Sequence, residues 1–326
     1  MLVSPYSDAY FLKARDTLRR DGRDPVVTMQ VFQRKNAVLS GLNEAVSYIK
    51  GHARIHSLAT LAKEGMEIKP WQTIMHIVGF YREFAHLETQ YLGILARSTM
   101  IATNMRAVVD AANGKPIFFM GARHTHWKTQ ESDGAAAMVG GATYVGTDAH
   151  GSAVGDRGMG TMPHSLIAVY GGDLGEACRA FAEHNAGPVT ALVDFNNDSL
   201  GDTKKANDVL GKRLAAVRLD TSGSLIDKCM EAEGLHGVNP DLVFKVRRFL
   251  DNNLKRPDVK IVVSGGFNAD KIMTFESLGV PVDMYGVGSS VLVGSNDFTA
   301  DIVKVDGKLV SKVGRGFTPV GEICGP

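Results

Sequence analysis

The chain has 326 residues, of which 44% are hydrophobic and 22% are charged, and its formal net charge is +1. This length and composition predict a globular protein with an ample core, built from one large and one smaller domain. A nearly neutral chain without blocks of like charge gives no indication of a nucleic-acid or membrane surface, so we expect neither partner.

The cysteines and the N-terminus indicate the compartment. Cys178, Cys229 and Cys324 are widely spaced and odd in number, which argues against a disulfide framework or a cysteine-based zinc site. The residues from Met1 to Pro5 lack the basic-then-apolar pattern of a signal peptide, and no apolar run is long enough to span a membrane. We therefore expect a cytoplasmic protein.

Up to the turn at residues 113–116, strands and helices do not alternate regularly. The expected elements are helices at 8–20 and 39–50, strands at 26–32 and 74–79, and a helical tract at 84–111 that is broken near Gly93. This pattern predicts an α+β sandwich, with helices on one side of a small sheet.

From residue 116 onward, short apolar runs alternate with helical patterns. The expected strands are 117–120, 143–145, 189–193, 215–219, 259–263 and 282–285, and the expected helices are 131–139, 174–184, 203–210, 241–252 and 269–278. Sustained alternation predicts a parallel sheet with helices outside it, curled into a barrel. Polar residues at the carboxyl ends of these strands should then form the active site.

Glycines follow the last two predicted strands. The first of these strands ends at Ser264, Gly265 and Gly266, and the second ends at Gly286 and Gly288. Glycine lets backbone N–H groups approach an anion closely, and a following helix N-terminus adds its dipole. Two such loops side by side predict a phosphate site rather than two simple tight turns.

Charged residues lie at other strand ends. Arg123 follows the first strand of the barrel, Asp194 follows another, and Arg218 and Asp220 close a third. Carboxylates that face a phosphate need a cation between them, and Mg²⁺ held by a few carboxylates and substrate oxygens meets that need. Asp194 and Asp220 are therefore the candidate metal ligands.

His124 and His126 leave a second enzyme class open. A His-x-His pair places two imidazoles on one face of an extended segment, as in metal-dependent barrel hydrolases. Such enzymes need further histidines and a late aspartate at strand ends, where this chain has glycines. The pattern favours a polar loop over a metal site.

The motifs together resemble nicotinate phosphoribosyltransferases, most closely the shorter archaeal-type members, and the related quinolinate and nicotinamide phosphoribosyltransferases. The resemblance runs nearly end to end, through residues 121–123, 140–141, 160–165, 193–194, 217–221, 264–266, 286–288 and 312–315. It implies an open-faced α/β sandwich (residues 1–115 and 291–326) and an irregular, incomplete TIM-like α/β barrel (116–290). It also implies a homodimer or a hexamer with shared active sites.

The resemblance implies a reaction and its co-substrates. Nicotinate would react with phosphoribosyl pyrophosphate and Mg²⁺ to give nicotinate mononucleotide and pyrophosphate in NAD salvage, with ATP as a possible co-substrate. Asp194 and Asp220 would lie near the ribose and the metal, and His164 would accept a phosphoryl group from ATP. A phosphoribosyl-binding protein without catalysis remains an alternative, which the two aspartates disfavour.

The resemblance also assigns the ligand contacts. Arg218 would lie at the centre of the site, and the cradle for the 5′-phosphate would consist of Ser264, Gly265, Gly266, Gly286 and Gly288. Arg123 would bind the pyridine carboxylate, and Tyr10 of a neighbouring subunit would stack on the ring. Asp148 falls where nicotinamide-using relatives hold the amide, or it points instead at an amide of the glycine-rich loop at residues 151–160.

The resemblance ranks the bases as nicotinate, then nicotinamide, then quinolinate. Quinolinate carries a second carboxylate, but residues 88–90 lack the arginine that quinolinate enzymes have there. Their His-Arg pair is absent after the second barrel strand, at residues 144–148. An unpaired second carboxylate would be costly to desolvate.

Overall fold

The computed structural model describes residues 5–319, which form two compact units. Among these residues, the first unit comprises 5–104, 135–140 and 293–319, and the second comprises 105–134 and 141–292. In this division residues 105–115 group with the second unit and 135–140 with the first, against predicted boundaries at 115 and 290. The C-terminal segment belongs to the first unit.

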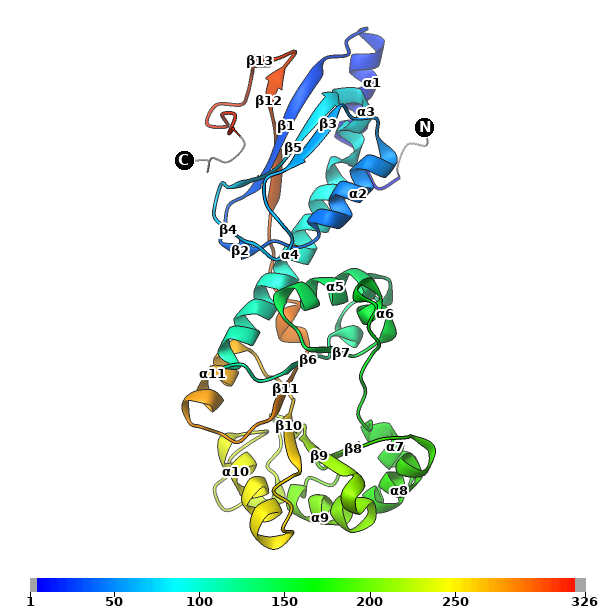
Figure 1. Cartoon of the computed structure of the whole chain (residues 1–326), viewed down its shortest axis with the longest axis vertical. Helices are drawn as coiled ribbons and strands as arrows, with labels where there is room; N and C mark the ends of the chain where they lie inside the picture. Colours follow the sequence, from blue (N-terminus) through cyan, green and yellow to red (C-terminus); the bar gives the residue numbers. More distant parts are fainter. Residues whose placement is uncertain (1–4, 320–326) are drawn as a thin grey trace. The chain divides into compact units, whose positions relative to one another are not determined.

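An antiparallel sheet forms the centre of the first unit, with strand order β13-β12-β1-β5-β3 (Figure 1). Its strands are β1 (Val26–Gln33), β3 (Ser57–Thr60), β5 (Thr73–Phe80), β12 (Phe298–Val305) and β13 (Lys308–Leu309). A separate pair consists of β2 (Ala37–Val38) and β4 (Glu67–Ile68). The returning β12 pairs with β1, so the end of the chain completes the sheet begun near its start.

Helices cover one face of this sheet. The helices of the first unit are α1 (Ala9–Arg20), α2 (Leu42–His52), α3 (Tyr81–Phe84) and the first two thirds of α4 (Glu88–Ala111). The buried core joins Val31 and Ile77 of the sheet to Ile49 of α2 and to Tyr91 and Leu95 of α4. The apolar stripes of α2 and α4 thus account for the sandwich.

The C-terminal segment lies against the sheet. Thr318 donates its backbone N–H to Gln30 Oε1 at 2.9 Å, and the ring of Phe317 stacks on His76 at 5.3 Å. Gln30 and His76 are both buried, although strand residues on an open face would be exposed. Residues 316–318 therefore cover part of the face that an open-faced sandwich leaves free.

Six parallel strands form the sheet of the second unit, in the order β7-β6-β11-β10-β9-β8. They are β6 (Ile117–Phe119), β7 (Tyr144–Val145), β8 (Val189–Leu192), β9 (Leu214–Leu219), β10 (Lys260–Val263) and β11 (Met284–Val287). The α-helices are α5 (Gln130–Gly140), of which only residues 130–134 belong to this unit, α6 (Asp148–Gly151), α7 (His164–Val169), α8 (Leu174–His184), α9 (Ser199–Leu210), α10 (Pro240–Arg248) and α11 (Ala269–Ser277). The sheet is an incomplete barrel, and the predicted fold class is confirmed.

Three local predictions are wrong. Helix α4 runs unbroken through Gly93, because one glycine costs a helix only about 1 kcal/mol, which burial of Tyr91 and Leu95 outweighs. Gly286 lies inside β11 rather than in the loop after it. The helix expected from residue 39 begins at Leu42, after Gly41 in a left-handed conformation. Strands β3, β4, β12 and β13 carried no clear pattern and were not predicted.

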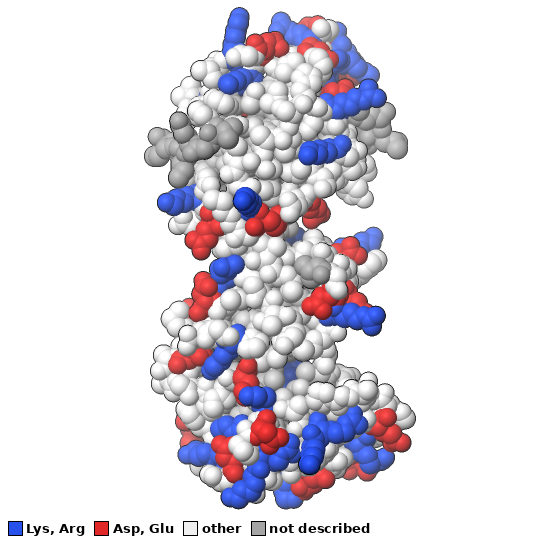
Figure 2. Space-filling model, viewed as in Figure 1, with Lys and Arg blue, Asp and Glu red and all other residues white. Residues whose placement is uncertain are grey.

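The surface offers no extended region of one charge on the face shown in Figure 2, where basic and acidic side chains are interspersed. Among residues 5–319, no helix is long and apolar enough to cross a membrane.

Candidate active site

The predicted site residues of the second unit gather at the carboxyl ends of its parallel strands. Asp220 directly follows β9, Ser264 follows β10 and Gly288 follows β11. Asp194 stands two residues after the end of β8. Because β8, β9, β10 and β11 are consecutive neighbours in a parallel sheet, their ends form one edge, which we call the rim.

Arg218 holds the centre of the rim through three hydrogen bonds. It donates from Nε to Ser264 Oγ at 2.9 Å, from Nη1 to Thr161 Oγ1 at 3.1 Å and from Nη2 to Asp220 Oδ2 at 2.9 Å. Ser264 Oγ in turn donates to Asp220 Oδ1 at 2.7 Å. The guanidinium has five N–H groups, so two are left for a ligand.

Ser264 has both of its hydrogen-bond donors engaged. Its hydroxyl accepts from Arg218 and donates to Asp220, and its backbone N–H donates to Leu219 O at 2.9 Å. Ser264 thereby fixes the geometry of the Arg218–Asp220 ion pair, whose side chains are only 15% and 17% exposed. Its predicted contact with a phosphate stays a prediction.

His164 pairs with Asp194. His164 is the first residue of α7, and its Nε2 lies 3.1 Å from both carboxylate oxygens of Asp194. The hydrogen bond to Asp194 raises the pKa of His164 above 6.5, the charge of Asp220 adds to the rise, and burial and Arg218 oppose it. Since Asp194 fixes the proton on Nε2, Nδ1 carries the free lone pair.

The glycines of the rim serve different purposes. Gly265 and Gly266 are exposed and have φ angles of +84° and +75°, which favour glycine, and α11 begins three residues later. A Cβ on Gly286 would meet Met120 Sδ at 3.0 Å and the Cβ of Ser264 at 3.1 Å. Gly286 thus allows close packing, while Gly265 and Gly266 leave their backbone exposed at the rim.

The turn after β6 places Arg123 and His124 at the same edge. Both belong to a 3-10 turn, Ala122–His124, and Arg123 is exposed with no side-chain partner among residues 5–319. A Cβ on Gly288 would lie 2.9 Å from His124 Nε2, so this imidazole sits over the end of β11. Arg123 is free to bind an anion.

The expected geometry of His124 and His126 is found only in part. Thr125 and His126 are extended, but His124 belongs to the 3-10 turn Ala122–His124, and His126 Nδ1 accepts the backbone N–H of Lys128 and caps a second 3-10 turn. Among residues 5–319, no three His, Cys, Asp or Glu side chains are grouped so as to hold a metal ion. The metal-hydrolase alternative required such a group of ligands around His124 and His126.

Asp148 faces the glycine-rich loop. Its Oδ1 accepts the backbone N–H of Gly158 at 2.9 Å, one of the two roles predicted for it. A Cβ on Gly158 would lie 2.6 Å from the backbone of Thr147, so only glycine lets the loop pack this closely. Asp148 therefore anchors the loop of residues 151–160.

Tyr10 belongs to the first unit. It lies on α1, its side chain is 62% exposed, and its ring contacts Phe11 at 4.2 Å between centroids. An exposed aromatic ring on a surface helix is available for stacking.

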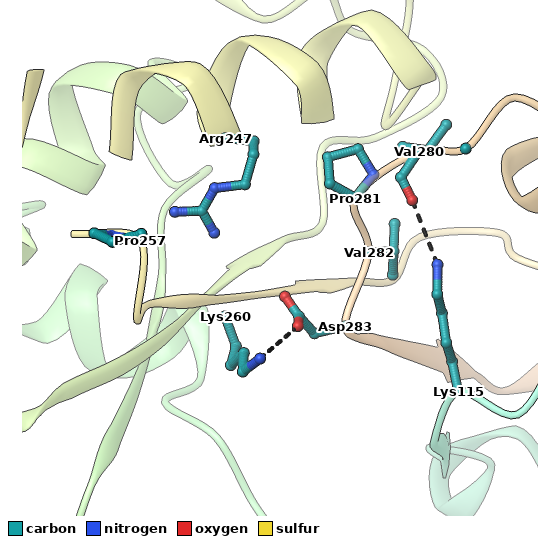
Figure 3. Close-up of a pocket in the computed structure, with 9 residues that line it drawn as sticks. Lys115, Arg247, Pro257, Lys260, Val280, Pro281, Val282 and Asp283 are labelled. Atoms are coloured by element: carbon teal, nitrogen blue, oxygen red, sulfur yellow. Dashed lines mark hydrogen bonds and ion pairs between the residues drawn. The ribbon is translucent and has the colours of Figure 1, made fainter. Parts of the chain in front are cut away.

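A hollow of about 360 Å³ lies at the opposite, amino-terminal ends of β10 and β11 (Figure 3). Lys260 forms an ion pair with Asp283 at 3.0 Å, and Lys115 pairs with Glu276 at 2.7 Å. Arg247 donates to Val259 O and pairs with Asp251. The cations that line the hollow thus brace the surrounding loops. The hollow is therefore a poor candidate for catalysis.

Two residues at the rim had not been singled out. Thr161 bonds to Arg218, and Met120 lies against Gly286. The sequence offered one indication of the role of Thr161, which is its position three residues before the candidate His164. No sequence feature indicated a role for Met120.

Comparison with known proteins identifies the family. Residues 8–99 match the N-terminal domain, and residues 101–298 the C-terminal domain, of quinolinate phosphoribosyl transferase. A solved structure titled nicotinate-nucleotide pyrophosphorylase, from Pyrococcus furiosus, is 32% identical with a TM-score of 0.83, covering 95% of this chain and 77% of that one.

Curated relatives are named nicotinate phosphoribosyltransferase. The pncB1 protein of Mycobacterium tuberculosis is 33% identical over 259 residues, which is 76% of this chain and 54% of that protein. A Bacillus subtilis relative is 22% identical over 97% of this chain and 70% of its own length. The chain thus spans about half the length of its Mycobacterium relative. Since the two domain matches cover most of its residues, the chain belongs to the quinolinate phosphoribosyltransferase family.

Proposed function

We propose that the protein is a phosphoribosyltransferase of NAD biosynthesis that joins nicotinate to phosphoribosyl pyrophosphate. The observation that carries the proposal is the rim, where Arg218, Asp220 and Ser264 form one network and His164 pairs with Asp194. Membership in the family and relatives named for nicotinate support it.

The 5′-phosphate would bind at the end of β10. Gly265 and Gly266 are exposed there, and α11 adds the positive end of its dipole. Gly288 and His124 lie at the end of the neighbouring strand. Ser264 supports this site through Asp220 and Arg218.

The reaction breaks the bond from C1 of ribose to pyrophosphate and forms a bond from C1 to the pyridine nitrogen. Positive charge builds on the sugar and negative charge on the leaving pyrophosphate. The Asp220 and Asp194 carboxylates would stabilise the sugar, and the free N–H groups of Arg218 would receive an oxyanion. These groups are already ordered by their hydrogen bonds, so little reorganisation is needed.

The rim carboxylates suit a metal ion that arrives with its substrate. Asp220 and Asp194 each accept hydrogen bonds, and each oxygen keeps a further lone pair. Mg²⁺ is usually held by one or two carboxylates together with substrate phosphates, which matches two acids better than a closed protein cage. When bound, Mg²⁺ would neutralise charge on the pyrophosphate.

ATP coupling would proceed through His164. The Nδ1 lone pair would attack the γ-phosphorus of ATP, forming an N–P bond as the bond to ADP breaks. Labelled ATP should give an acid-labile, base-stable phosphoprotein that His164→Ala lacks. Because only the neutral imidazole attacks, labelling should increase as pH rises through the raised pKa. If the parent protein shows no label and no stimulation by ATP, ATP coupling is excluded, but the transferase activity is not.

The base would be nicotinate, with nicotinamide second and quinolinate third. Arg123 offers one unpaired guanidinium, which suits a single carboxylate. The negative charge of Asp148 would repel a nicotinate carboxylate. However, Asp148 accepts a hydrogen bond from the backbone of Gly158, which gives it a structural role instead. The matched family description names quinolinate, so all three bases need direct comparison.

The proposed active site would be completed in a homodimer or hexamer. Tyr10, which is exposed on α1, would then stack on the pyridine in a neighbouring subunit. Light scattering of the purified protein should give an even number of subunits, and Tyr10→Ala should raise KM for the base.

The test of the proposed function is product analysis with phosphoribosyl pyrophosphate, Mg²⁺ and each of the three bases. Nicotinate mononucleotide and pyrophosphate should form in equal amounts, with the highest kcat/KM for nicotinate. A higher kcat/KM for nicotinamide or quinolinate would overturn the choice of base. Absence of pyrophosphate release with every base would overturn the transferase.

A further inference from the structure

Among the residues that the structure describes, Thr161 is the one hydroxyl that connects Arg218 to a segment outside β9 and β10. Arg218 and Asp220 come from β9 and its end, and Ser264 from the end of β10. Thr161 comes from the stretch before α7, more than fifty residues earlier in the chain. Its Oγ1 is the acceptor for Nη1, at 3.1 Å.

Three anchors from three segments define the plane of the guanidinium. A guanidinium is flat, so bonds at Nε, Nη1 and Nη2 together fix both its position and its rotation. With Nε and Nη2 alone held, by neighbours in the sheet, the Nη1 edge would be free to tilt. That edge carries one of the two N–H groups left for a ligand.

The segment that carries Thr161 is itself held. Met162 is fully buried, Pro163 is the N-cap residue of α7, and His164 pairs with Asp194. The first and last residues of the segment 161–164 therefore link to both acidic ends of the rim: Thr161 through Arg218 to Asp220, and His164 directly to Asp194.

We propose that Thr161 is a positioning residue that sets the plane of the Arg218 guanidinium toward the anionic part of the ribosyl substrate. The consequence for turnover rests on the proposed function, whereas the effect on the guanidinium does not. The side chain acts by its hydroxyl oxygen, so serine should replace it and valine should not.

The first measurement needs no substrate. Arginine side-chain ¹⁵N NMR of the unliganded protein, assigned with Arg218→Lys, reports how fast the Arg218 N–H groups rotate and exchange with solvent. Thr161→Val should speed the rotation about Cζ–Nη1, and Thr161→Ser should restore the parent rate. Thr203→Val is the matched control, since Thr203 Oγ1 is buried without a hydrogen-bond partner among the described residues.

The second measurement is steady-state kinetics with phosphoribosyl pyrophosphate and nicotinate. Loss of a hydrogen bond to a charged group should lower kcat/KM for phosphoribosyl pyrophosphate about tenfold in Thr161→Val. Thr161→Ser and Thr203→Val should stay within about twofold of the parent protein.

The proposal is overturned if Thr161→Val leaves the Arg218 signals and kcat/KM as in the parent. It is also overturned if Thr161→Ser is as impaired as Thr161→Val, because the methyl group rather than the hydroxyl would then matter. If the parent has no transferase activity, the proposed function fails, and the NMR comparison alone still decides the role of Thr161.

Discussion

The two ends of the parallel sheet both collect charged side chains but differ in what those side chains have left to offer. At the amino-terminal hollow, Lys115, Lys260 and Arg247 each pair with a carboxylate. At the rim, Arg218 keeps two N–H groups free, and Arg123 has no side-chain partner among residues 5–319.

The number of charged side chains therefore does not identify an active site. The lining of the hollow has more cations than acids, yet the hydrogen bonds of these cations hold loops together. The rim holds fewer cations but keeps unused donors beside exposed glycine backbone. Substitutions at the rim should therefore change turnover, and those at the hollow should change stability.

The largest expected effect is at Asp220. Asp220→Asn removes the charge opposite Arg218 and a candidate metal ligand, and should lower kcat about a hundredfold or more, as loss of one electrostatic contributor does. Its matched control is Asp283→Asn at the hollow, which breaks the pair with Lys260 but should leave kcat within about twofold. Near-normal turnover of Asp220→Asn in a Mg²⁺-dependent assay would refute the assignment.

The next effect concerns stability at the hollow. Arg247 is 18% exposed, donates to Val259 O at 2.7 Å and Arg256 O at 3.0 Å, and pairs with Asp251. Arg247→Met should lower the free energy of unfolding by roughly 2 kcal/mol, since bonds to a charged group are lost. Urea denaturation measures this, and KM for both substrates should not change. A kinetic defect without a loss of stability would contradict a purely structural role for the hollow.

The third effect is a pH dependence at the rim. Since Asp194 raises the pKa of His164, the stabilisation from this pair is complete below the usual value of 6.5. It is lost as pH rises through the raised pKa. The difference in unfolding free energy between the parent and His164→Gln should therefore shrink with increasing pH.

Asp194→Asn should abolish that pH dependence, since the partner charge is gone. A difference that grows toward alkaline pH would contradict the pairing of His164 with Asp194.

The smallest effect is at Asp148. This side chain is exposed, so its charge is screened by solvent. Asp148→Ser keeps an oxygen for Gly158 but removes the charge, and should shift the ratio of kcat/KM for nicotinate over nicotinamide by about threefold toward nicotinate. Competition between the two bases in one reaction measures the ratio, and a shift toward nicotinamide would contradict this account.

Much of the fold could be predicted from periodicity. The strands of the barrel are short apolar runs between helical patterns, and α8 was predicted with its observed ends. Strand β12 could not be predicted, because its burial pattern is mostly intermediate and its partner β1 lies more than 260 residues earlier. Gly286 was placed in a loop because glycine usually ends strands, whereas here it gives Met120 room.

The site was predictable at the level of strand ends but not of hydrogen bonds. Asp194, Arg218 and Asp220 follow from the rule that barrel chemistry lies at carboxyl ends. The hydrogen bond from Ser264 to Asp220 depends on the register of β9 and β10, in which Val263 lies opposite Leu219. Thr161 joins Arg218 from a loop of irregular structure, for which no periodicity exists.

Backbone hydrogen exchange with and without phosphoribosyl pyrophosphate and Mg²⁺ tests most directly whether the substrate binds at the rim. We expect slower exchange at residues 264–268 and 288–290, at the ends of β10 and β11. We expect unchanged exchange at residues 255–260 and 279–283, around the hollow. Protection of the hollow, with none at the rim, would contradict a substrate site at the rim.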